Sequence, residues 1–442
     1  MSIFKAYDVR GVVPRDLNED VAYRIGRAAP LVLGAKSMVV GRDMRRSSEA
    51  LARALIRGIA ESGCDATDIG LCTTPMNYFA VGSGPYGGAA MVTASHNPAE
   101  WNGFKFSRSG AAPVSYETGL AEMERLVAGE LPPAPGTRGR VEKKDVRPAY
   151  VRHLLKFAEG IGPLTVVVDA GNGMAGMVLP EIFEHLPCRL HALYFELDGS
   201  FPNHEANPLK RENLVDLQAE VRATGADIGV AFDGDADRCM FVDETGEPVS
   251  SDLVTALLAR ELLERERGAA VVYDLRSSRV VPEEIRKAGG VPVETRVGHS
   301  FMKAILREHK GPMGGELSGH YYFRDHFYSD SGEVAMLVML RMLSRSGRRM
   351  SELVAPLRRY SATGEINFEV EDKDAMIEAL ASAFRDGEQS RLDGLTVRYK
   401  DWWFNVRKSN TEPVLRLNLE ADTPEIRDRA RARVEAVLRG RA

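Results

Sequence analysis

The sequence predicts an α/β protein of several domains, for three reasons. At 442 residues the chain is too long for a single hydrophobic core, so two to four domains are expected. As far as residue 358, short apolar runs that end in polar or glycine-rich loops alternate with amphipathic helical patterns. From Gly364 the order changes to strand, helix, several strands and a final helix. We therefore place the domains at residues 1–145, 146–248, 249–358 and 359–442.

The composition is that of an ordinary soluble globular protein, with 44% hydrophobic and 27% charged residues. The 58 basic and 63 acidic residues are well mixed, which argues against a nucleic-acid-binding surface or a polybasic membrane patch. The N-terminal residues lack the apolar core of a signal peptide, and the apolar stretch 334–343 is too short to span a bilayer. The four cysteines have no metal-binding or redox spacing. We expect a cytoplasmic protein with four buried free thiols.

The first domain contains an apolar run, Ala89–Val92, that stops at Thr93-Ala94-Ser95-His96-Asn97-Pro98. This pattern predicts a buried strand that ends in a loop, and the proline makes the loop rigid because it fixes its own φ. Ser95 would then lie at a strand end, where α/β proteins often place catalytic groups. The alternative is an ordinary turn in which Ser95 and Asn97 satisfy local backbone groups.

Two further signals complete the first domain. Asn102-Gly103 predicts a hairpin, which places Lys105 ten residues after Ser95. The proline-rich segment from Leu131, with charges as far as Lys144, predicts a linker to the second domain.

The second domain opens with a predicted strand, Leu164–Asp169, followed by a glycine pattern and a helix. Gly171, Gly173 and Gly176 match G-x-G-x-x-G, and Glu196 lies about where a ribose-binding acid would follow. A dinucleotide site is therefore one alternative. The same pattern also occurs wherever a strand turns tightly into a helix.

The next predicted strand, 227–232, leads directly into Asp233-Gly234-Asp235-Ala236-Asp237-Arg238. Three carboxylates at alternate positions repel one another, and a divalent cation removes that repulsion. The spacing differs from that of an EF-hand, because glycine comes second and no glutamate stands at the twelfth position. We therefore predict a Mg²⁺ site that is shared with a phosphate. The alternative is a solvated acidic turn.

The third domain begins near Ser251 and contains a glycine-bracketed loop, Gly314-Gly315-Glu316-Leu317-Ser318-Gly319-His320. Glycines around Glu, Ser and His fit a loop that approaches a polyhydroxyl ligand, since one carboxylate can accept hydrogen bonds from two sugar hydroxyls. An earlier predicted strand leads to Arg276, and another ends at His299. Taken singly, His299 and His320 are equally compatible with structural histidines.

In the C-terminal domain, Arg407-Lys408-Ser409-Asn410-Thr411-Glu412-Pro413 lies between predicted strands. An arginine, two hydroxyls, an amide and free backbone N–H groups in a tight turn can hold a phosphate. The alternative is a charged hairpin tip. Thr423-Pro424 predicts the start of the last helix.

These four motifs, in this order, resemble those of the α-D-phosphohexomutase superfamily over nearly the whole chain. In that family the TASHNP loop carries a phosphoserine, the DGDADR turn binds Mg²⁺, the GExSGH loop contacts sugar hydroxyls and the RxSNTEP loop holds the substrate phosphate. The resemblance implies three similar α/β domains, a smaller, mobile α+β C-terminal domain, and an active site in a central cleft. It also implies interconversion of hexose 1-phosphate and hexose 6-phosphate through a hexose 1,6-bisphosphate.

The resemblance also implies roles for individual residues. Ser95 would carry the phosphoryl group and contribute to the metal site with Asp233, Asp235 and Asp237. Lys105 or His320 would be the general acid/base. Arg276 stands where some relatives have lysine, so its role in distinguishing isomers is open. The groups expected around the transferring phosphoryl are Arg10, Lys105, Arg238 and His320, and those expected around the sugar and the other phosphate are Tyr7, His299, Glu316, Ser318, Arg407, Ser409, Asn410 and Thr411.

Within the family, Leu317 and Asn410 resemble the bacterial phosphomannomutase/phosphoglucomutase branch, whereas phosphoglucosamine mutases tend to have GEQSGH and SGTEP. We therefore expect mannose or glucose phosphates as substrates, with phosphoglucosamine mutase as the alternative. Two more distant alternatives are a dinucleotide-dependent oxidoreductase and an inactive relative that only binds sugar phosphates. We expect no nucleic-acid or membrane partner, and a monomer in preference to a dimer.

Overall fold

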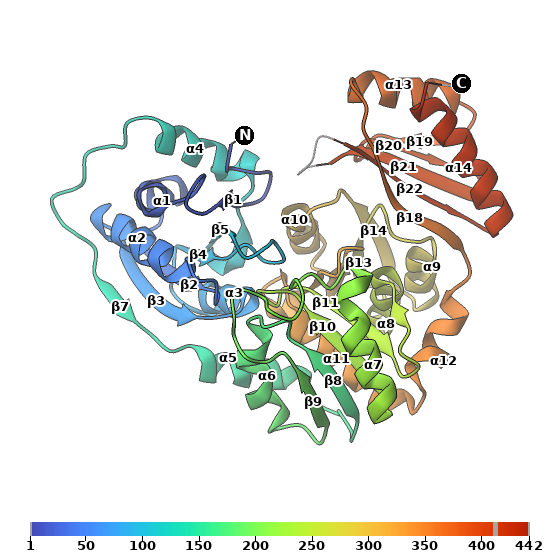
Figure 1. Cartoon of the computed structure of the whole chain (residues 1–442), viewed down its shortest axis with the longest axis horizontal. Coiled ribbons are helices and arrows are strands. Elements are labelled where there is room, and N and C mark those ends of the chain that lie inside the picture. Colours follow the sequence, from blue (N-terminus) through green and yellow to red (C-terminus); the bar gives the residue numbers. More distant parts are fainter. Residues whose placement is uncertain (1, 410–413, 441–442) are drawn as a thin grey trace.

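The computed structural model describes residues 2–409 and 414–440, which form four sheets with flanking helices. Figure 1 shows the N-terminal and C-terminal domains on either side of the second and third. The three α/β units and the smaller C-terminal unit confirm the predicted fold class.

The first domain has a seven-stranded sheet in the order β1-β5-β4-β2-β3-β7, with β6 paired to β5. Strands β2, β3, β4 and β7 run parallel, whereas β5 and β1 add antiparallel pairs at one side. The strands are β1 (Val9–Val12), β2 (Ser37–Arg42), β3 (Asp65–Leu71), β4 (Gly88–Val92), β5 (Trp101–Arg108), β6 (Ala112–Pro113) and β7 (Val141–Lys143), and the helices are α1 (Glu19–Leu33), α2 (Ser48–Glu61), α3 (Thr74–Ser83) and α4 (Ala121–Ala128).

The hairpin predicted at Asn102-Gly103 is wrong, because both residues lie inside β5 and pair with β1. Glycine is needed at 103 for close packing, since a Cβ there would lie 1.9 Å from the carbonyl oxygen of Val9. The Asn102 amide donates to the hydroxyls of Ser47 and Ser48 instead of forming a turn. The predicted linker is also shorter than expected, because its end forms β7 and joins the sheet beside β3.

The second and third domains each contain a five-stranded mixed sheet, in the orders β12-β11-β10-β8-β9 and β14-β13-β15-β16-β17. The second comprises β8 (Thr165–Asp169), β9 (Arg189–Leu193), β10 (Ile228–Phe232), β11 (Cys239–Asp243) and β12 (Pro248–Val249), with α5 (Arg147–Leu154), α6 (Ala175–Phe183) and α7 (Val215–Thr224). The third comprises β13 (Ala270–Asp274), β14 (Val291–Thr295), β15 (Met313–Gly315), β16 (Tyr321–Phe323) and β17 (Ser329–Asp330), with α8 (Ser251–Leu263), α9 (Val280–Lys287), α10 (His299–His309), α11 (Gly332–Ser346) and α12 (Met350–Val354).

The C-terminal domain is an antiparallel sheet in the order β18-β22-β21-β20-β19 with two helices. Thr423 caps its last helix through a hydrogen bond from the Ile426 backbone, which confirms the predicted helix start. The elements are β18 (Ser361–Phe368), β19 (Glu388–Ser390), β20 (Leu395–Arg398), β21 (Trp402–Lys408), β22 (Leu415–Ala421), α13 (Lys373–Ala383) and α14 (Pro424–Leu438).

The first three domains share a hydrophobic core, and the C-terminal domain has a separate one. One core runs continuously through the first three domains, from Val39 to Leu357, whereas the C-terminal domain packs around a core made of its own residues. Charged and polar contacts connect that domain to the third, including Arg279 with Asp422 at 2.7 Å and Arg398 with Glu294 at 2.6 Å.

The junction of the first three domains encloses a carboxyl group. Glu333 is fully buried and accepts a hydrogen bond from Ser331 at 3.0 Å, and Thr73 of the first domain and Tyr150 of the second lie beside it, so each of the three domains contributes to its surroundings. Burial raises the pKa of Glu333 to about 7. The apolar stretch 334–343 lies in α11, whose central residues are buried in the common core. Among the described residues, no helix is both long and apolar enough to cross a membrane.

Candidate active site

Ser95 lies in the loop after β4 with its backbone at φ +50°, in the left-handed region that few residues other than glycine adopt. Its backbone N–H donates to Thr93 Oγ1 at 2.9 Å. Its side chain is almost fully buried and donates to Asp233 Oδ2 at 2.6 Å. Strain of this kind is characteristic of functional positions. The loop therefore brings the serine hydroxyl directly against the aspartate turn of the second domain.

The three aspartates of that turn follow β10 and are buried. One carboxylate oxygen of each lies within 4.8 Å of the other two. In the described part of the chain, Oδ1 of Asp235 and Oδ1 of Asp237 have no hydrogen-bond partner. Burial and the two neighbouring carboxylates raise the pKa of Asp233. Buried, converging and incompletely paired oxygens of this kind fit a hard divalent cation such as Mg²⁺.

Lys105 and Arg10 bring positive charge to the same place. Lys105 on β5 contacts Asp235 Oδ2 at 2.7 Å and lies still closer to Asp237. Burial alone would lower the pKa of Lys105, but these two carboxylates outweigh it and raise that pKa. Arg10 donates to the carbonyl of Ala94 and, at 2.7 Å, to Asn97 in the serine loop.

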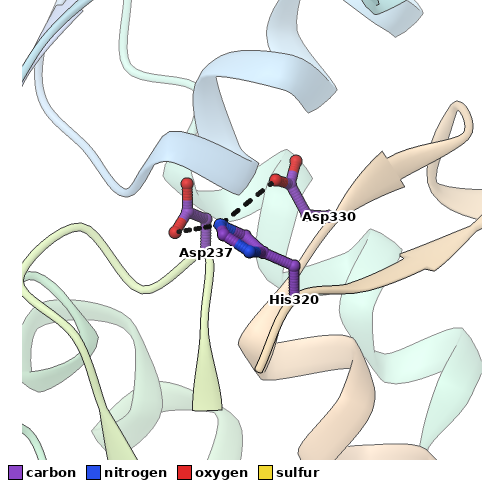
Figure 2. A group of neighbouring side chains, drawn as sticks. All are labelled: Asp237, His320 and Asp330. Carbon is purple, nitrogen blue, oxygen red and sulfur yellow. Dashed lines mark ion pairs between the residues drawn. The ribbon is translucent and has the colours of Figure 1, made fainter. Parts of the chain in front are cut away.

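His320 connects the aspartate turn to the third domain. Figure 2 shows its ring between Asp237 and Asp330, with Nε2 at 3.6 Å from the first carboxylate and 3.9 Å from the second. Arg238 Nε lies 3.1 Å from the same nitrogen. Burial and Arg238 lower the pKa of His320, but Asp237 and Glu316 raise it more, to about 9. The imidazole is therefore held beside the aspartate turn in a form that can donate a proton.

The loop between β15 and β16 presents the predicted sugar-binding groups. Glu316 is buried and accepts hydrogen bonds from Gly298 N at 3.0 Å, Ser318 Oγ at 3.0 Å and Tyr322 at 3.1 Å. Burial raises the pKa of Glu316, but His320 and Arg276 outweigh it, so the net pKa lies below its usual range. Glu316 is thus an ionised acceptor, as recognition of two sugar hydroxyls requires.

Tyr7 and His299 lie beside this loop. The Tyr7 hydroxyl donates to the carbonyl of Val297 at 2.9 Å, and its ring meets the His299 ring edge-on at 5.3 Å. His299 is the first residue of α10, and its ring lies 6.5 Å from that of His320. Burial lowers the pKa of His299. The first domain therefore contacts the third at Val297 and His299, beside the predicted sugar-binding loop.

The predicted phosphate-binding loop begins at the end of β21. Arg407 is buried and pairs with Glu365 at 2.9 Å. Arg416 contacts the other oxygen of that carboxylate at 2.9 Å, and Arg276 of the third domain approaches it at 3.9 Å. Ser409 is described at the loop entrance, where its N–H donates to the Val414 carbonyl. The predicted contacts of Asn410 and Thr411 lie outside the described residues.

A chain of contacts thus links side chains of the three α/β domains, from Tyr7 through His299, His320 and the aspartate turn to Ser95. A second path joins Arg407 to them through Glu365 and Arg276, since Asp274 binds both Arg276 and the backbone of Leu317 beside Glu316. The arrangement combines a buried serine, three converging carboxylates, a buried imidazole and a group of arginines around Glu365.

Four family models match the chain in sequence order. All describe phosphoglucomutase/phosphomannomutase: α/β/α domain I at residues 1–132, domain II at 148–246, domain III at 250–360 and the C-terminal domain at 365–437. The chain belongs to the phosphoglucomutase/phosphomannomutase family.

Similar proteins span the same length. A phosphomannomutase of Escherichia coli (strain K12) is 40% identical over 98% of both chains. A phosphomannomutase/phosphoglucomutase of Pseudomonas aeruginosa is 39% identical over 96% of this chain and 92% of the relative. The crystal structure of a family protein from Burkholderia thailandensis has a TM-score of 0.92 at 36% identity and covers 99% of this chain and 97% of that one. The expected family and its mutase reaction class are confirmed.

The glycine pattern of the second domain has a packing role in this phosphoglucomutase/phosphomannomutase fold. A Cβ at Gly173 would lie 2.9 Å from the backbone of Gly234, and one at Gly176 would lie 2.2 Å from the carbonyl of Phe195. Met174 N also donates to the carbonyl of Gly234. The tight turn therefore lets β8 and its loop support the aspartate turn, which explains the glycines without a dinucleotide.

Three residues that contact the site groups were not identified from the sequence. Thr74 donates to Asp235 Oδ2 at 2.6 Å, Asp330 lies beside His320, and Arg45 binds the carbonyl groups of the serine loop. Thr74 starts α3, and its place after β3 is the only sequence signal for it. Asp330 and Arg45 lie in polar segments with no chemical pattern of their own.

Proposed function

We propose that the protein interconverts the 1-phosphates and 6-phosphates of mannose and glucose through a phosphoserine at Ser95 and a hexose 1,6-bisphosphate. The observation that carries the proposal is the hydrogen bond from Ser95 Oγ to Asp233, beside Lys105 and His320. A buried serine hydroxyl among cations and a carboxylate turn suits phosphoryl transfer, in which positioning and charge stabilisation provide most of the catalysis.

In the first half-reaction, the bond between phosphorus and Ser95 Oγ breaks and a bond forms to the free hydroxyl of the sugar monophosphate. The sugar hydroxyl gives its proton to a base, and Ser95 Oγ receives one from an acid. Lys105 and His320 are the candidates for these two transfers, since both contact the aspartate turn. The bisphosphate then turns over and returns its other phosphoryl group to Ser95.

Asp233, Asp235 and Asp237, with Ser95, would hold the Mg²⁺. In the described part of the chain, Oδ1 of Asp235 and Oδ1 of Asp237 accept no hydrogen bond, which leaves them able to bind the ion. When bound, the ion would neutralise charge on the phosphoryl oxygens. The protein's own part is to hold the four ligands together and to keep Lys105 against the other oxygen, Oδ2, of Asp235 and Asp237.

Glu316 and Ser318 support dual sugar specificity. Mannose and glucose differ only at the 2-hydroxyl, whereas we assign these two residues to O3 and O4. These oxygens nearly exchange places when the bisphosphate turns over, so one pocket serves both orientations. Arg407, Ser409, Asn410 and Thr411, with Tyr7, would hold the phosphate that is not being transferred. Leu317 favours these sugars over glucosamine phosphate.

We propose a monomer in preference to a dimer. The four cysteines are free thiols, which supports a reducing, cytoplasmic location. Cys188 is half-buried rather than buried, so the expectation of four buried thiols is corrected to three.

The test is a comparison of wild type and Ser95→Ala on mannose 1-phosphate, glucose 1-phosphate and glucosamine 1-phosphate, with Mg²⁺ and a trace of bisphosphate. Wild type should turn over the first two best and gain the mass of one phosphate, whereas Ser95→Ala should lose both properties. Ser107→Ala, a buried serine on β5, is the matched control. A Ser95→Ala enzyme that retains more than a few per cent of activity would contradict the phosphoserine.

A further inference from the structure

Arg45 occupies the segment between β2 and α2, and its side chain has no exposed surface. Its guanidinium donates to four carbonyl oxygens of the serine loop and the segment after it. One terminal nitrogen contacts the carbonyls of Ser95 at 2.8 Å and Asn97 at 2.6 Å, and the other those of Pro98 at 2.7 Å and Trp101 at 3.1 Å. One side chain therefore fixes both ends of the loop that carries the nucleophile.

Arg45 is itself held in place from its own segment. Asp43 lies 3.2 Å from Arg45 Nε and also accepts hydrogen bonds from the Arg45 backbone at 3.0 Å and from Ser48 at 2.5 Å. A buried guanidinium is costly unless its donors are paired, and this one finds most of its partners in the loop. Lysine could not replace it equally, because an ammonium lacks the planar fork that reaches four carbonyls.

The second domain covers the other side of the guanidinium. The ring of Phe201 lies 5.0 Å from the guanidinium carbon of Arg45. Phe201 has φ +52°, an unfavourable backbone conformation for an aromatic residue. Nearby Gly199 packs so closely that a Cβ would lie 2.5 Å from Arg45 Cα. The loop of the second domain that contains Gly199 and Phe201 therefore packs against Arg45, although the backbone conformation of Phe201 is unfavourable.

We propose that Arg45 is a positioning residue for the phosphoryl carrier, and that Phe201 couples its position to the second domain. Ser95 must hold a left-handed backbone while its hydroxyl meets Asp233, which belongs to the second domain. Arg45 fixes the opposite side of the same residue through its carbonyl. Phe201 packs the second domain against Arg45. Arg45 and the second domain therefore together align the Ser95 hydroxyl with the aspartate turn. The proposal rests on the function proposed above.

The experiment measures single-turnover transfer from hexose 1,6-bisphosphate to Ser95 by intact mass. It gives both the rate of transfer and the final phosphorylated fraction. Arg45→Lys and Phe201→Leu should slow the rate roughly 10- to 100-fold, because small misplacements of a reacting group have effects of that size. The final fraction and the KM for hexose phosphate should stay near wild type. Phe201→Tyr, which keeps the ring, should restore the rate, and Arg46→Lys, at an exposed neighbour, should leave it unchanged.

A purely structural role would give a smaller phosphorylated fraction that still reacts at the wild-type rate, and that result overturns the proposal. If Arg45→Lys does not fold, Phe201→Leu provides the test. A Phe201→Leu protein that transfers the phosphoryl group to Ser95 at the wild-type rate also overturns the proposal. Wild-type protein that never gains phosphate at Ser95 would instead refute the phosphoserine itself. The two failures are therefore distinguishable.

Discussion

Replacement of Arg407 by alanine separates binding from chemistry. Arg407 is buried at the end of β21 and is connected to the other site groups through Glu365 and Arg276. We propose that it binds the phosphate that is not being transferred. Its removal should therefore weaken substrate binding and leave the serine and the aspartate turn intact.

The size of the effect follows from the contacts. A charge-assisted bond between guanidinium and phosphate contributes about 1.5–3 kcal/mol, which corresponds to about one to two decades in affinity. Loss of Arg407 does not leave Glu365 unpaired, because Arg416 stays at 2.9 Å and Arg276 at 3.9 Å. Stability should therefore change little, and the KM for both hexose phosphates should rise by about tenfold or more.

The assay is steady-state turnover on mannose 1-phosphate and glucose 1-phosphate, with separate measurement of Ser95 phosphorylation by the bisphosphate. We expect the C-terminal domain to close on the phosphate that Arg407 binds, so loss of Arg407 should weaken this closure and lower kcat as well. The fall in kcat should be smaller than in Ser95→Ala. Lys408→Ala is the matched control, since Lys408 is half-exposed and pairs with exposed Asp374. An unchanged KM for both substrates in Arg407→Ala would show that the loop is only a charged hairpin tip.

Two predictions concern the buried carboxyl groups. Chelation should stop turnover without unfolding the protein, and Mg²⁺ should restore it, because the aspartate turn needs a cation; full activity in excess chelator would exclude the metal role. Burial raises the pKa of Glu333 from the usual 4.5 to about 7, so wild type should lose roughly 3 kcal/mol of unfolding free energy as pH rises through that interval. Urea unfolding at about pH 5 and pH 8 should show this loss in wild type but not in Glu333→Gln. The same pH dependence of stability in both proteins would contradict the role of Glu333.

The motif-bearing loops were predictable because their signals are local. An apolar run followed by Ser95, or by three aspartates, indicates a strand end and its chemistry within a few residues, and β4 and β10 confirm both strands. Arg45 and Asp330 were not predictable, since Arg45 meets Ser95 fifty residues away and Asp330 lies near His320 only through the pairing of β16 with β17. Such contacts are created by folding and leave no local pattern.

The error at Asn102-Gly103 has a different origin. The dipeptide is typical of tight hairpins because glycine tolerates a positive φ. In this protein glycine is needed for its missing side chain, since β1 approaches too closely for a Cβ. One residue type thus meets two physical requirements, and the sequence alone does not say which requirement applies.

The C-terminal domain has its own core and contacts the third domain through ion pairs, so we expect it to shift as one body without disturbing the other three sheets. In the proposed reaction, the substrate phosphate binds Arg407 and so favours the position in which that body lies over the sugar. A C-terminal domain that lies over the sugar would exclude water from the site while the phosphoryl group is transferred, which limits wasteful hydrolysis. The ion pairs of Arg279 with Asp422 and of Arg398 with Glu294 would then influence how much of the phosphoryl group is lost to water in each catalytic cycle.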